Sequence, residues 1–325
     1  MNILVDGRPL QDRRSGGVRR LAEGLLPALK QASPDLNWIV GTTGTHRYSG
    51  SDIHVPMPNK ILSALFALRL SSLDMHFDQA KADAMLFFNL GFSGPISIPY
   101  ALIVHDLSFL IEPKWFRPRA RIWHKLVSPK RMIKHARRIF AVSDNTKQDL
   151  IRLLQVDEQS IDTIPLGIDT LPPANPPANP PQGKFIIVIG DGDPRKNTSV
   201  ALEAARQNGI QAILTGKSGK NVTADAELAW LYEHASAFLY PSWYEGFGIP
   251  LHEAAHYGTP IIASTAAPLP ITAPTGTIFA APEKPHHWVK ALKDILEKPD
   301  AYRTSTQRQD WSAAAKIISD RMRHL

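Results

Sequence analysis

The stretch Leu171-Pro-Pro-Ala-Asn-Pro-Pro-Ala-Asn-Pro-Pro181 lies near the midpoint of a 325-residue chain and holds six prolines in eleven residues. Proline fixes φ and removes the backbone donor, so neither a helix nor a central strand can continue through this stretch. We expect an extended, semi-rigid connector. It separates two parts of domain size, which we place at residues 1–170 and 183–304, with the linker at 171–182.

Both parts show the same alternation of strand-like and helix-like segments. Short apolar runs end at glycine, serine or aspartate, and an amphipathic stretch follows each run. The expected strands are 3–5, 38–40, 84–88, 101–104 and 139–142 in the first part, and 185–189, 212–215, 237–240 and 260–263 in the second. Strands that are apolar on both faces and separated by helices predict an α/β fold, with two Rossmann-like domains whose parallel sheets face each other across a cleft.

The composition limits the kinds of site that the chain can form. It has 37 Lys and Arg against 30 Asp and Glu, a formal net charge of +7, and 43% hydrophobic residues, as in ordinary globular proteins. It has no cysteine, which excludes disulfides, thiolate metal sites and cysteine nucleophiles and fits a cytoplasmic compartment. The apolar start at Met1–Asp6 is too short for a secretory signal, and Arg69 interrupts the apolar stretch Ile61–Leu70. We therefore expect a soluble or peripheral protein.

The densest pattern beyond a predicted strand end, where sheets of this type bind ligands, is Pro241-Ser-Trp-Tyr-Glu-Gly-Phe-Gly-Ile-Pro-Leu-His-Glu253. Its glycines permit close backbone approach, its second proline suits the first turn of a helix, and amides at a helix start can hold an anion. The carboxylates of Glu245 and Glu253 can bind two hydroxyl-bearing parts of one ligand, such as two sugar rings. An ordinary strand-to-helix connection with a capping glutamate explains the same residues equally well.

A second pattern, Gly190-Asp-Gly-Asp-Pro-Arg-Lys-Asn197, also follows a predicted strand and opens a helix. The dipole at a helix start repels cations, so Arg195 and Lys196 suit an anion better than they suit helix stability. A diphosphate fits, because arginine offers a fork of donors and lysine a point charge. A dinucleotide-binding fingerprint is incomplete, since Arg195 stands where the third glycine belongs.

One pattern favours a different chemistry. The sequence His252-Glu-Ala-Ala-His256 matches the zinc-protease signature, in which two histidines one helical turn apart hold the metal. Gly258 and Pro260 end the helix soon afterwards, and Ile262 stands where the extended signature has a third histidine. We therefore expect no metal site.

Two features of the first half are candidates for ligand contact. Ser15-Gly16-Gly17-Val18 follows the first strand, and a glycine pair there would let a ligand lie against the backbone, although a plain turn at a helix start is the simpler explanation. His105 follows the strand 101–104. It is either a satisfied structural histidine or a residue that binds a substrate hydroxyl or moves a proton.

The segment Lys114–Arg138 is unusually basic. It holds ten Lys or Arg and no Asp or Glu, interleaved with three aromatic residues, Trp115, Phe116 and Trp123. A solvated helix face is the usual explanation of a charge run, but here no local acid can pair with the cations. We expect an acidic partner, either an anionic membrane lipid or a phosphate-bearing acceptor, rather than nucleic acid.

Taken in order, these motifs resemble the retaining glycosyltransferases of family 4, which have the two-domain GT-B fold. The resemblance covers most of the chain and is carried by the stretches Asp6-Gly-Arg-Pro9, Gly16-Gly-Val-Arg-Arg20, Val104-His-Asp-Leu107, Ala141-Val-Ser143, Ile164-Pro-Leu-Gly-Ile-Asp169, Asp193-Pro-Arg-Lys-Asn197, Pro241 to Glu253 and Gly258-Thr-Pro260. It also implies that the last residues, 305–325, form a terminal helix that packs back toward the first domain.

The resemblance implies a nucleotide-sugar donor, such as GDP-mannose or a UDP-sugar, and a glycan or lipid-linked acceptor, with no cofactor. Catalytic roles fall to Glu245, which meets the donor sugar, and to His105. Other residues implied to bind the donor are Gly16, Gly17, Arg195, Lys196, Gly246, Phe247, Gly248, Ile249 and Glu253. Arg195 and Lys196 would neutralise the diphosphate in place of a metal, and Glu253 would hold the ribose.

In such enzymes the acceptor attacks from the front face, and the departing phosphate aids its deprotonation, so catalysis is largely positioning and charge stabilisation. The chain departs from the family pattern at Leu269-Pro270-Ile271, where a glutamate is common, and in a short segment after Lys196. Two alternatives stay open: a GT-B epimerase acting on a UDP-sugar, and a non-catalytic protein that binds sugar nucleotides or polyanions.

Overall fold

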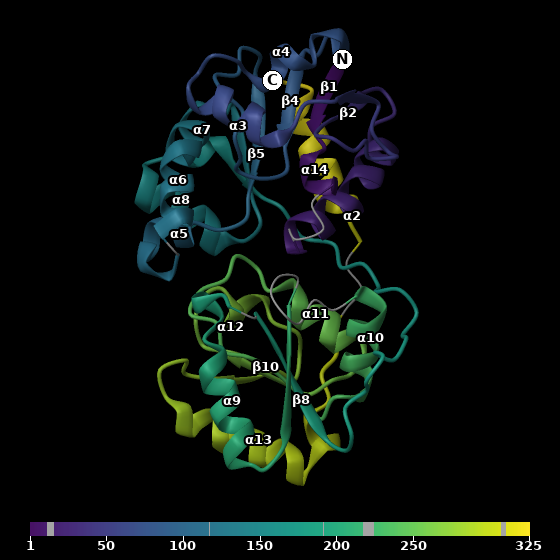
Figure 1. Ribbon diagram of the computed structural model, residues 1–325, viewed down its shortest axis with the longest axis vertical. Coiled ribbons are helices and arrows are strands. Elements are labelled where there is room, and N and C mark those ends of the chain that lie inside the picture. The colour runs from purple at the N-terminus through teal and green to yellow at the C-terminus, as the bar shows by residue number, and fades with distance from the viewer. Residues whose placement is uncertain (12–15, 117, 191, 217–223, 307–309) are drawn as a thin grey trace. The chain divides into compact units, whose positions relative to one another are not determined.

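The computed structural model describes residues 1–11, 16–116, 118–190, 192–216, 224–306 and 310–325 (Figure 1). Contacts divide the chain into two compact units. Unit 1 comprises Met1–Gly167 together with Gln309–Leu325, and unit 2 comprises Ile168–Arg308. The boundaries expected from the sequence were 170, 182 and 304.

Unit 1 contains a seven-stranded parallel sheet in the order β3-β2-β1-β4-β5-β6-β7. Its strands are β1 (Asn2–Asp6), β2 (Asn37–Thr43), β3 (Ile53–Val55), β4 (Ala84–Phe87), β5 (Tyr100–Val104), β6 (Arg138–Ala141) and β7 (Ile161–Thr163). Every residue of β4 and β5 is buried, because helices cover both faces of the sheet. The helices are α1 (Arg8–Gln11), α2 (Gly16–Ala32), α3 (Asn59–Ala67), α4 (Leu73–His76), α5 (Ser108–Ile111), α6 (Pro118–Val127), α7 (Pro129–His135), α8 (Asp144–Leu154) and α14 (Ser312–Met322).

The C-terminal helix α14 belongs to unit 1, where it packs beside α2 (Figure 1). The hydroxyl of Ser319 donates to that of Ser33 at 2.9 Å, and both side chains are buried. The guanidinium of Arg321 donates to the Asp162 carboxylate at 2.8 Å. These contacts join the two ends of the chain in one domain.

Unit 2 contains a five-stranded parallel sheet in the order β12-β11-β10-β8-β9. Its strands are β8 (Phe185–Ile189), β9 (Gln211–Thr215), β10 (Ala237–Tyr240), β11 (Ile261–Ser264) and β12 (Ile278–Ala280). Its helices are α9 (Thr198–Gln207), α10 (Asp225–His234), α11 (Ile249–His256), α12 (Leu269–Thr272) and α13 (Pro285–Glu297). One apolar core joins the sheet to α10 and α11, and a second joins it to α9 and α13.

The start of the proline-rich stretch is attached to unit 2. Leu171 is 8% exposed and contributes to the core beside α10, and the amide of Asn175 donates to the Ala226 carbonyl at 3.0 Å. The start of the connector is thus held to unit 2 by an apolar side chain in its core and by a backbone hydrogen bond.

All nine strands expected from the sequence are confirmed, each to within two residues at either end except β2, which continues to Thr43. Three strands were missed, namely β3, β7 and β12. Each has three residues and lies at the edge of its sheet, so it is too short to give a hydrophobic pattern. Among the described residues, no helix combines the length and the apolar character that crossing a bilayer requires.

Candidate functional site

The strand order of unit 2 defines where a ligand site is expected. From β8 the chain passes to β9 on one side, and β10, β11 and β12 then build outward on the other side. In an open parallel sheet such a reversal leaves a crevice beyond the carboxyl ends of the two diverging strands. Here those strands are β8, which ends at Ile189, and β10, which ends at Tyr240.

An ion pair spans this reversal point. The Lys196 ammonium donates to Glu245 at 2.6 Å and to the Tyr240 hydroxyl at 2.9 Å. The two charged side chains are 18% and 13% exposed, so solvent screens the pair only weakly. Burial first, and then the charge of Glu245 and a hydrogen bond to it, raise the pKa of Tyr240 well above its ordinary value. Tyr240 therefore remains a neutral hydroxyl that links the cation to the carboxylate.

The position of Lys196 depends on a glycine. Gly190 follows β8 with φ +120°, and a Cβ atom there would lie 2.4 Å from the Lys196 Cβ and 2.2 Å from its Cγ. These atoms belong to the base of the side chain, which cannot swing away. Only glycine lets the lysine stem pass over the end of β8 and reach Glu245.

Arg195 is held by its own loop. Its guanidinium donates to both carboxylate oxygens of Asp193, the shortest contact being 2.8 Å, and Asp193 also accepts from the Arg195 amide at 3.0 Å. Burial alone would raise the pKa of Asp193, but the Arg195 hydrogen bonds and charge lower it. The Arg195 carbonyl accepts from the Trp243 amide at 2.8 Å, which ties this loop to the loop after β10.

The loop after β10 leads into α11 through Gly248, whose φ of +99° requires glycine. Ile249 begins the helix, and Glu253 lies one turn later with 4% of its surface exposed. The Phe247 carbonyl accepts from the Thr272 hydroxyl at 2.6 Å. Together with Gly246, these residues lie at the carboxyl edge of the sheet, on the same side as Lys196 and Glu245.

The two histidines of α11 have different surroundings. His252 is buried, its Nε2 donates to the Thr272 carbonyl at 2.7 Å, and its Nδ1 accepts from the Thr306 hydroxyl at 3.0 Å. Burial lowers the pKa of His252, so the ring is neutral. His256 is exposed. Both ring nitrogens of His252 are therefore occupied, and the zinc-protease interpretation has no support in this geometry.

The other predicted site residues lie in unit 1. His105 follows β5, is partly exposed, and donates from Nε2 to the Phe88 carbonyl, which follows β4, at 2.8 Å. Burial lowers the pKa of His105, so Nδ1 carries a lone pair. Gly16 and Gly17 form the first turn of α2, while Ser15 lies outside the described residues.

Sequence reasoning found the charged members of the unit 2 site but not their partners. Tyr240 was taken only as the end of a strand, and Asp193 only as part of a motif. A tyrosine that ends a strand of otherwise apolar residues places a polar group at the ligand edge of the sheet, which is a signal for its role. The pairing of Lys196 with Glu245 had no such signal, because it joins residues 49 positions apart.

Two family models match consecutive parts of the chain. "Glycosyltransferase Family 4" matches residues 15–170, and "Glycosyl transferases group 1" matches residues 168–298. Among curated proteins, the chain is similar to O-antigen chain mannosyltransferase B of Escherichia coli, with 28% identity over 51% of this chain and 53% of that protein. The chain spans about half the length of the first curated relatives that it matches.

Solved structures share the fold over almost the whole chain. A sucrose-phosphate synthase from Thermosynechococcus elongatus has a TM-score of 0.75 at 19% identity, covering 99% of this chain and 98% of that chain. Anabaena HepE in complex with UDP and glucose has a TM-score of 0.63 at 15% identity, covering 99% and 95%. At these identities the similarity establishes the fold alone.

Proposed function

Because the chain belongs to glycosyltransferase family 4 and has the two α/β domains of the GT-B fold, we propose that it transfers a hexosyl group from a nucleotide-diphosphate sugar. The proposal includes retention of the anomeric configuration, a donor sugar of the mannose or glucose/GlcNAc type, and a glycan or lipid-linked acceptor. The observation that carries it is the Lys196–Glu245–Tyr240 cluster at the reversal point of the unit 2 sheet.

In this proposal the cluster binds the reacting part of the donor. Lys196 and Arg195 follow β8, one of the two diverging strands, and they would stabilise the charge of the leaving diphosphate. Glu245, held by Lys196, would accept hydrogen bonds from sugar hydroxyls, and the amides of residues 246–249 would add donors at the start of α11. Glu253 would hold the ribose. Two cations on the protein supply the charge that a metal supplies elsewhere, so we propose metal-independent transfer.

We assign supporting roles to the unit 1 residues. The neutral His105 has Nδ1 available as an acceptor, which suits a hydrogen bond from a sugar hydroxyl. Gly16 and Gly17 would let the donor approach the start of α2. The proposed location of the protein is the cytoplasmic side of a membrane. The basic segment Lys114–Arg138 would face the anionic surface of that membrane. The structure does not describe Arg117 or the side chains of Arg119 and Trp123. The proposed membrane contact therefore rests on the described cations of α6 and α7.

The names of similar proteins narrow the donors to test first. The Escherichia coli relative is named a mannosyltransferase, and the Anabaena structure holds UDP and glucose. We would therefore screen GDP-mannose, UDP-glucose and UDP-GlcNAc by thermal shift, since a ligand at about 100 times its Kd stabilises by about 2.7 kcal/mol. The donor that stabilises the protein most is then incubated with it without acceptor. Slow release of nucleoside diphosphate from that donor is the expected result.

Product analysis then tests the reaction type. NMR of the glycosylated product should give the same anomeric configuration as the donor, and activity should survive a chelator. Interconversion of the free UDP-sugar would indicate an epimerase instead. Donor binding with neither release nor interconversion would indicate a non-catalytic binding protein, and inversion or loss of activity with EDTA would contradict the mechanism proposed.

A further inference from the structure

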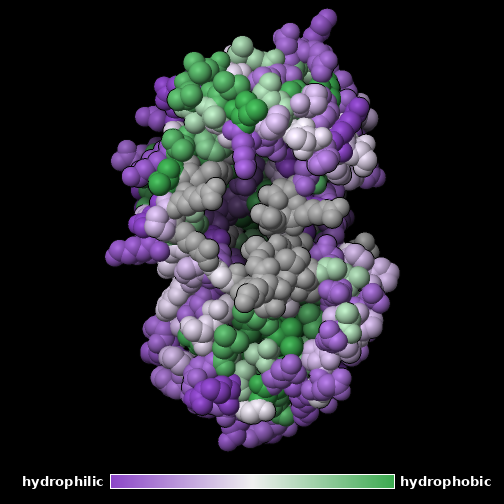
Figure 2. Space-filling model, in the orientation of Figure 1, coloured by the Kyte–Doolittle hydropathy of each residue, from purple (hydrophilic) through white to green (hydrophobic). Residues whose placement is uncertain are grey.

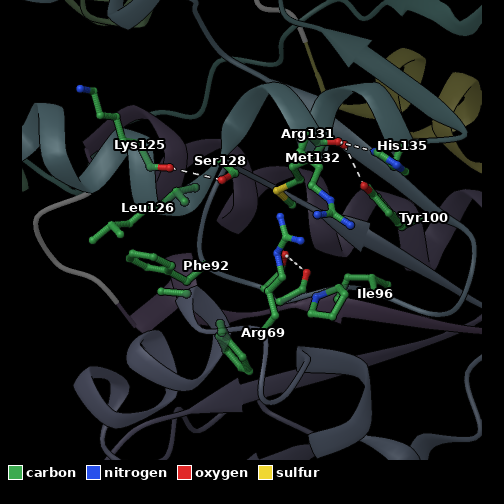
Figure 3. A pocket seen from close by; sticks show the side chains of 16 residues that line it. Arg69, Phe92, Ile96, Tyr100, Lys125, Leu126, Ser128, Arg131, Met132 and His135 are labelled. Atoms are coloured by element: carbon green, nitrogen blue, oxygen red, sulfur yellow. Dashed lines mark hydrogen bonds between the residues drawn. The ribbon is translucent and has the colours of Figure 1, made fainter.

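A pocket in unit 1 has a volume of about 250 Å³ and is lined by Tyr100, the first residue of β5, so it touches the amino end of that strand (Figure 3). Its other walls come from the end of α3 and the residues after it, the loop 92–96, the end of α6, and α7. The lining includes Arg69, Lys125, Arg131 and His135 but no aspartate or glutamate. A basic pocket without an acid is a site for an anion.

Two guanidinium groups converge in this pocket. Arg69 from the end of α3 and Arg131 from α7 point toward each other, whereas the Lys125 ammonium points away (Figure 3). Neither arginine forms an ion pair with a carboxylate in the part of the chain that the structure describes. Like charges that face one another repel, and an anion between them removes this repulsion. Arginine forks match the oxygens of a phosphate.

The backbone at Arg69 is of a kind that usually takes glycine. Its φ is +59°, and its amide donates to the Phe66 carbonyl at 3.1 Å while the Leu70 amide donates to the Leu65 carbonyl at 2.9 Å. This is the helix-ending arrangement in which glycine occupies the left-handed position. The chain carries an arginine there instead, which places a cation at the pocket at a cost in backbone strain.

Exposed aliphatic side chains are close in sequence to residues that line the pocket, and one of them, Leu126, lines it. Leu68 and Leu70 are 68% and 70% exposed beside Arg69, and Ile122 and Leu126 on α6 are 59% and 53% exposed. Phe92, in the wall, is partly exposed. Figure 2 shows hydrophobic surface gathered over α3 and α4 of unit 1. Exposed leucines next to a cationic pocket are typical of a surface that enters the boundary between lipid headgroups and acyl chains.

We propose that this pocket binds the headgroup phosphate of an anionic phospholipid, with these exposed aliphatic side chains inserted among the acyl chains. Their apolar surface is what favours a lipid over free phosphate, because a soluble anion gains nothing from exposed leucines. The inference narrows the proposed membrane contact from the whole segment Lys114–Arg138 to Arg131 and a residue outside it, Arg69. It does not depend on glycosyl transfer, because its test uses binding alone.

The test is co-sedimentation of the full chain with phosphatidylcholine vesicles that contain or lack phosphatidylglycerol. The double variant Arg69→Gln/Arg131→Gln should bind the anionic vesicles about thirtyfold more weakly, the factor that two basic residues near an anionic leaflet contribute. The matched control, Lys134→Gln/Arg137→Gln, removes the same charge from exposed cations that do not line the pocket. It should lose less than about fivefold, because these cations lie away from the headgroup site.

A second variant, Leu68→Ser/Leu70→Ser, should weaken binding at high salt, where the apolar contribution dominates. All these side chains are exposed, so each variant should fold like wild type. Circular dichroism and Tm check that it does. Three outcomes would overturn the proposal: equal binding of wild type to both vesicle types or to neither, equal losses in the pocket and control variants, or saturable binding of inorganic phosphate without vesicle binding. Donor hydrolysis, measured in parallel, reports separately on the proposed function.

Discussion

The cations of the unit 2 site and of the unit 1 pocket are arranged in opposite ways. Lys196 and Arg195 each lie within hydrogen-bonding distance of a carboxylate, at 2.6 and 2.8 Å, and the four side chains of the two pairs are only partly exposed. Arg69 and Arg131 are exposed, face each other, and form no ion pair with an acid of the described chain.

The two arrangements of cations suit different tasks. A cation held by a carboxylate has a fixed position before a ligand arrives, which suits catalysis by positioning. Two unpaired cations gain most from the ligand itself, since an anion relieves their repulsion, and this suits attachment. Variants in both units can show whether pairing with a carboxylate separates a reactive site from a docking site.

The largest effect is expected for Glu245→Gln. Losing a charged hydrogen bond costs about 1.5–3 kcal/mol, so kcat should fall about 10- to 150-fold while the Kd of the donor changes less. Steady-state kinetics and donor titration check this. The control is Glu203→Gln on α9, whose surface pair with Arg206 is exposed and should leave both quantities unchanged. A wild-type kcat for Glu245→Gln would show that this carboxylate does not contact the donor sugar.

Gly190→Ala tests whether Lys196 must pass over the end of β8. The added Cβ meets the lysine stem and the φ is unsuitable, so the free energy of unfolding should fall by about 2–3 kcal/mol and diphosphate binding should weaken. Gly209→Ala is the control, because Gly209 has a φ of +63° but no atom within 4 Å of a Cβ. Its loss should be smaller, with donor binding intact. Equal losses of stability and of donor binding in the two variants would mean that the Lys196 side chain moves aside without cost.

A pH series compares the two units through one histidine in each, His105 and His252. The pKa values of His105 and His252 are lowered by burial, so below pH about 6.5 the unfolded chain takes up protons that the folded chain does not. The free energy of unfolding should therefore decrease as the pH falls from 7.5 to 5.5, by at most about 1.4 kcal/mol per pH unit for each histidine. Urea unfolding of His105→Gln and His252→Gln should show a smaller decrease. A pH dependence identical to wild type in both variants would contradict these shifts.

The smallest effect on stability is expected for Arg69→Gly. Glycine relieves the left-handed backbone, so the free energy of unfolding should rise by about 0.5–1 kcal/mol while binding to phosphatidylglycerol vesicles falls. Lys81→Gly is the control, since Lys81 also has a positive φ of +44° and does not line the pocket. It should gain similar stability and keep its binding. Loss of binding in both variants, or in neither, would contradict a specific role for Arg69.

Most of the fold was predictable because burial leaves a strong trace in the sequence. Strands such as β8 are apolar along their whole length. Ser143 caps the start of helix α8, and its hydroxyl accepts from the Thr146 amide at 3.2 Å. The short edge strands left no such trace. Their pairing comes from neighbouring strands and not from their own residues.

The site was predictable in its residue types but less so in its contacts. Glycines, cations and carboxylates beyond strand ends singled out Arg195, Lys196 and Glu245 as candidates. Nothing local indicated that Lys196 donates to Glu245 or that Arg195 donates to Asp193. Arg69 appeared only as an interruption of an apolar stretch. Nothing in its local sequence indicated that it would face Arg131, 62 positions away (131 − 69).

Sequence alone was enough to predict the α/β class, the positions of nine strands and the side of each sheet on which polar residues gather. These features follow from local periodicity and turn residues. Tertiary packing set the strand order, and with it the divergence of β8 and β10 at the point that Lys196 and Glu245 bridge. It also decided that two arginines meet in one pocket. Contacts between residues far apart in sequence depend on how elements pack, and periodicity carries no information about packing partners.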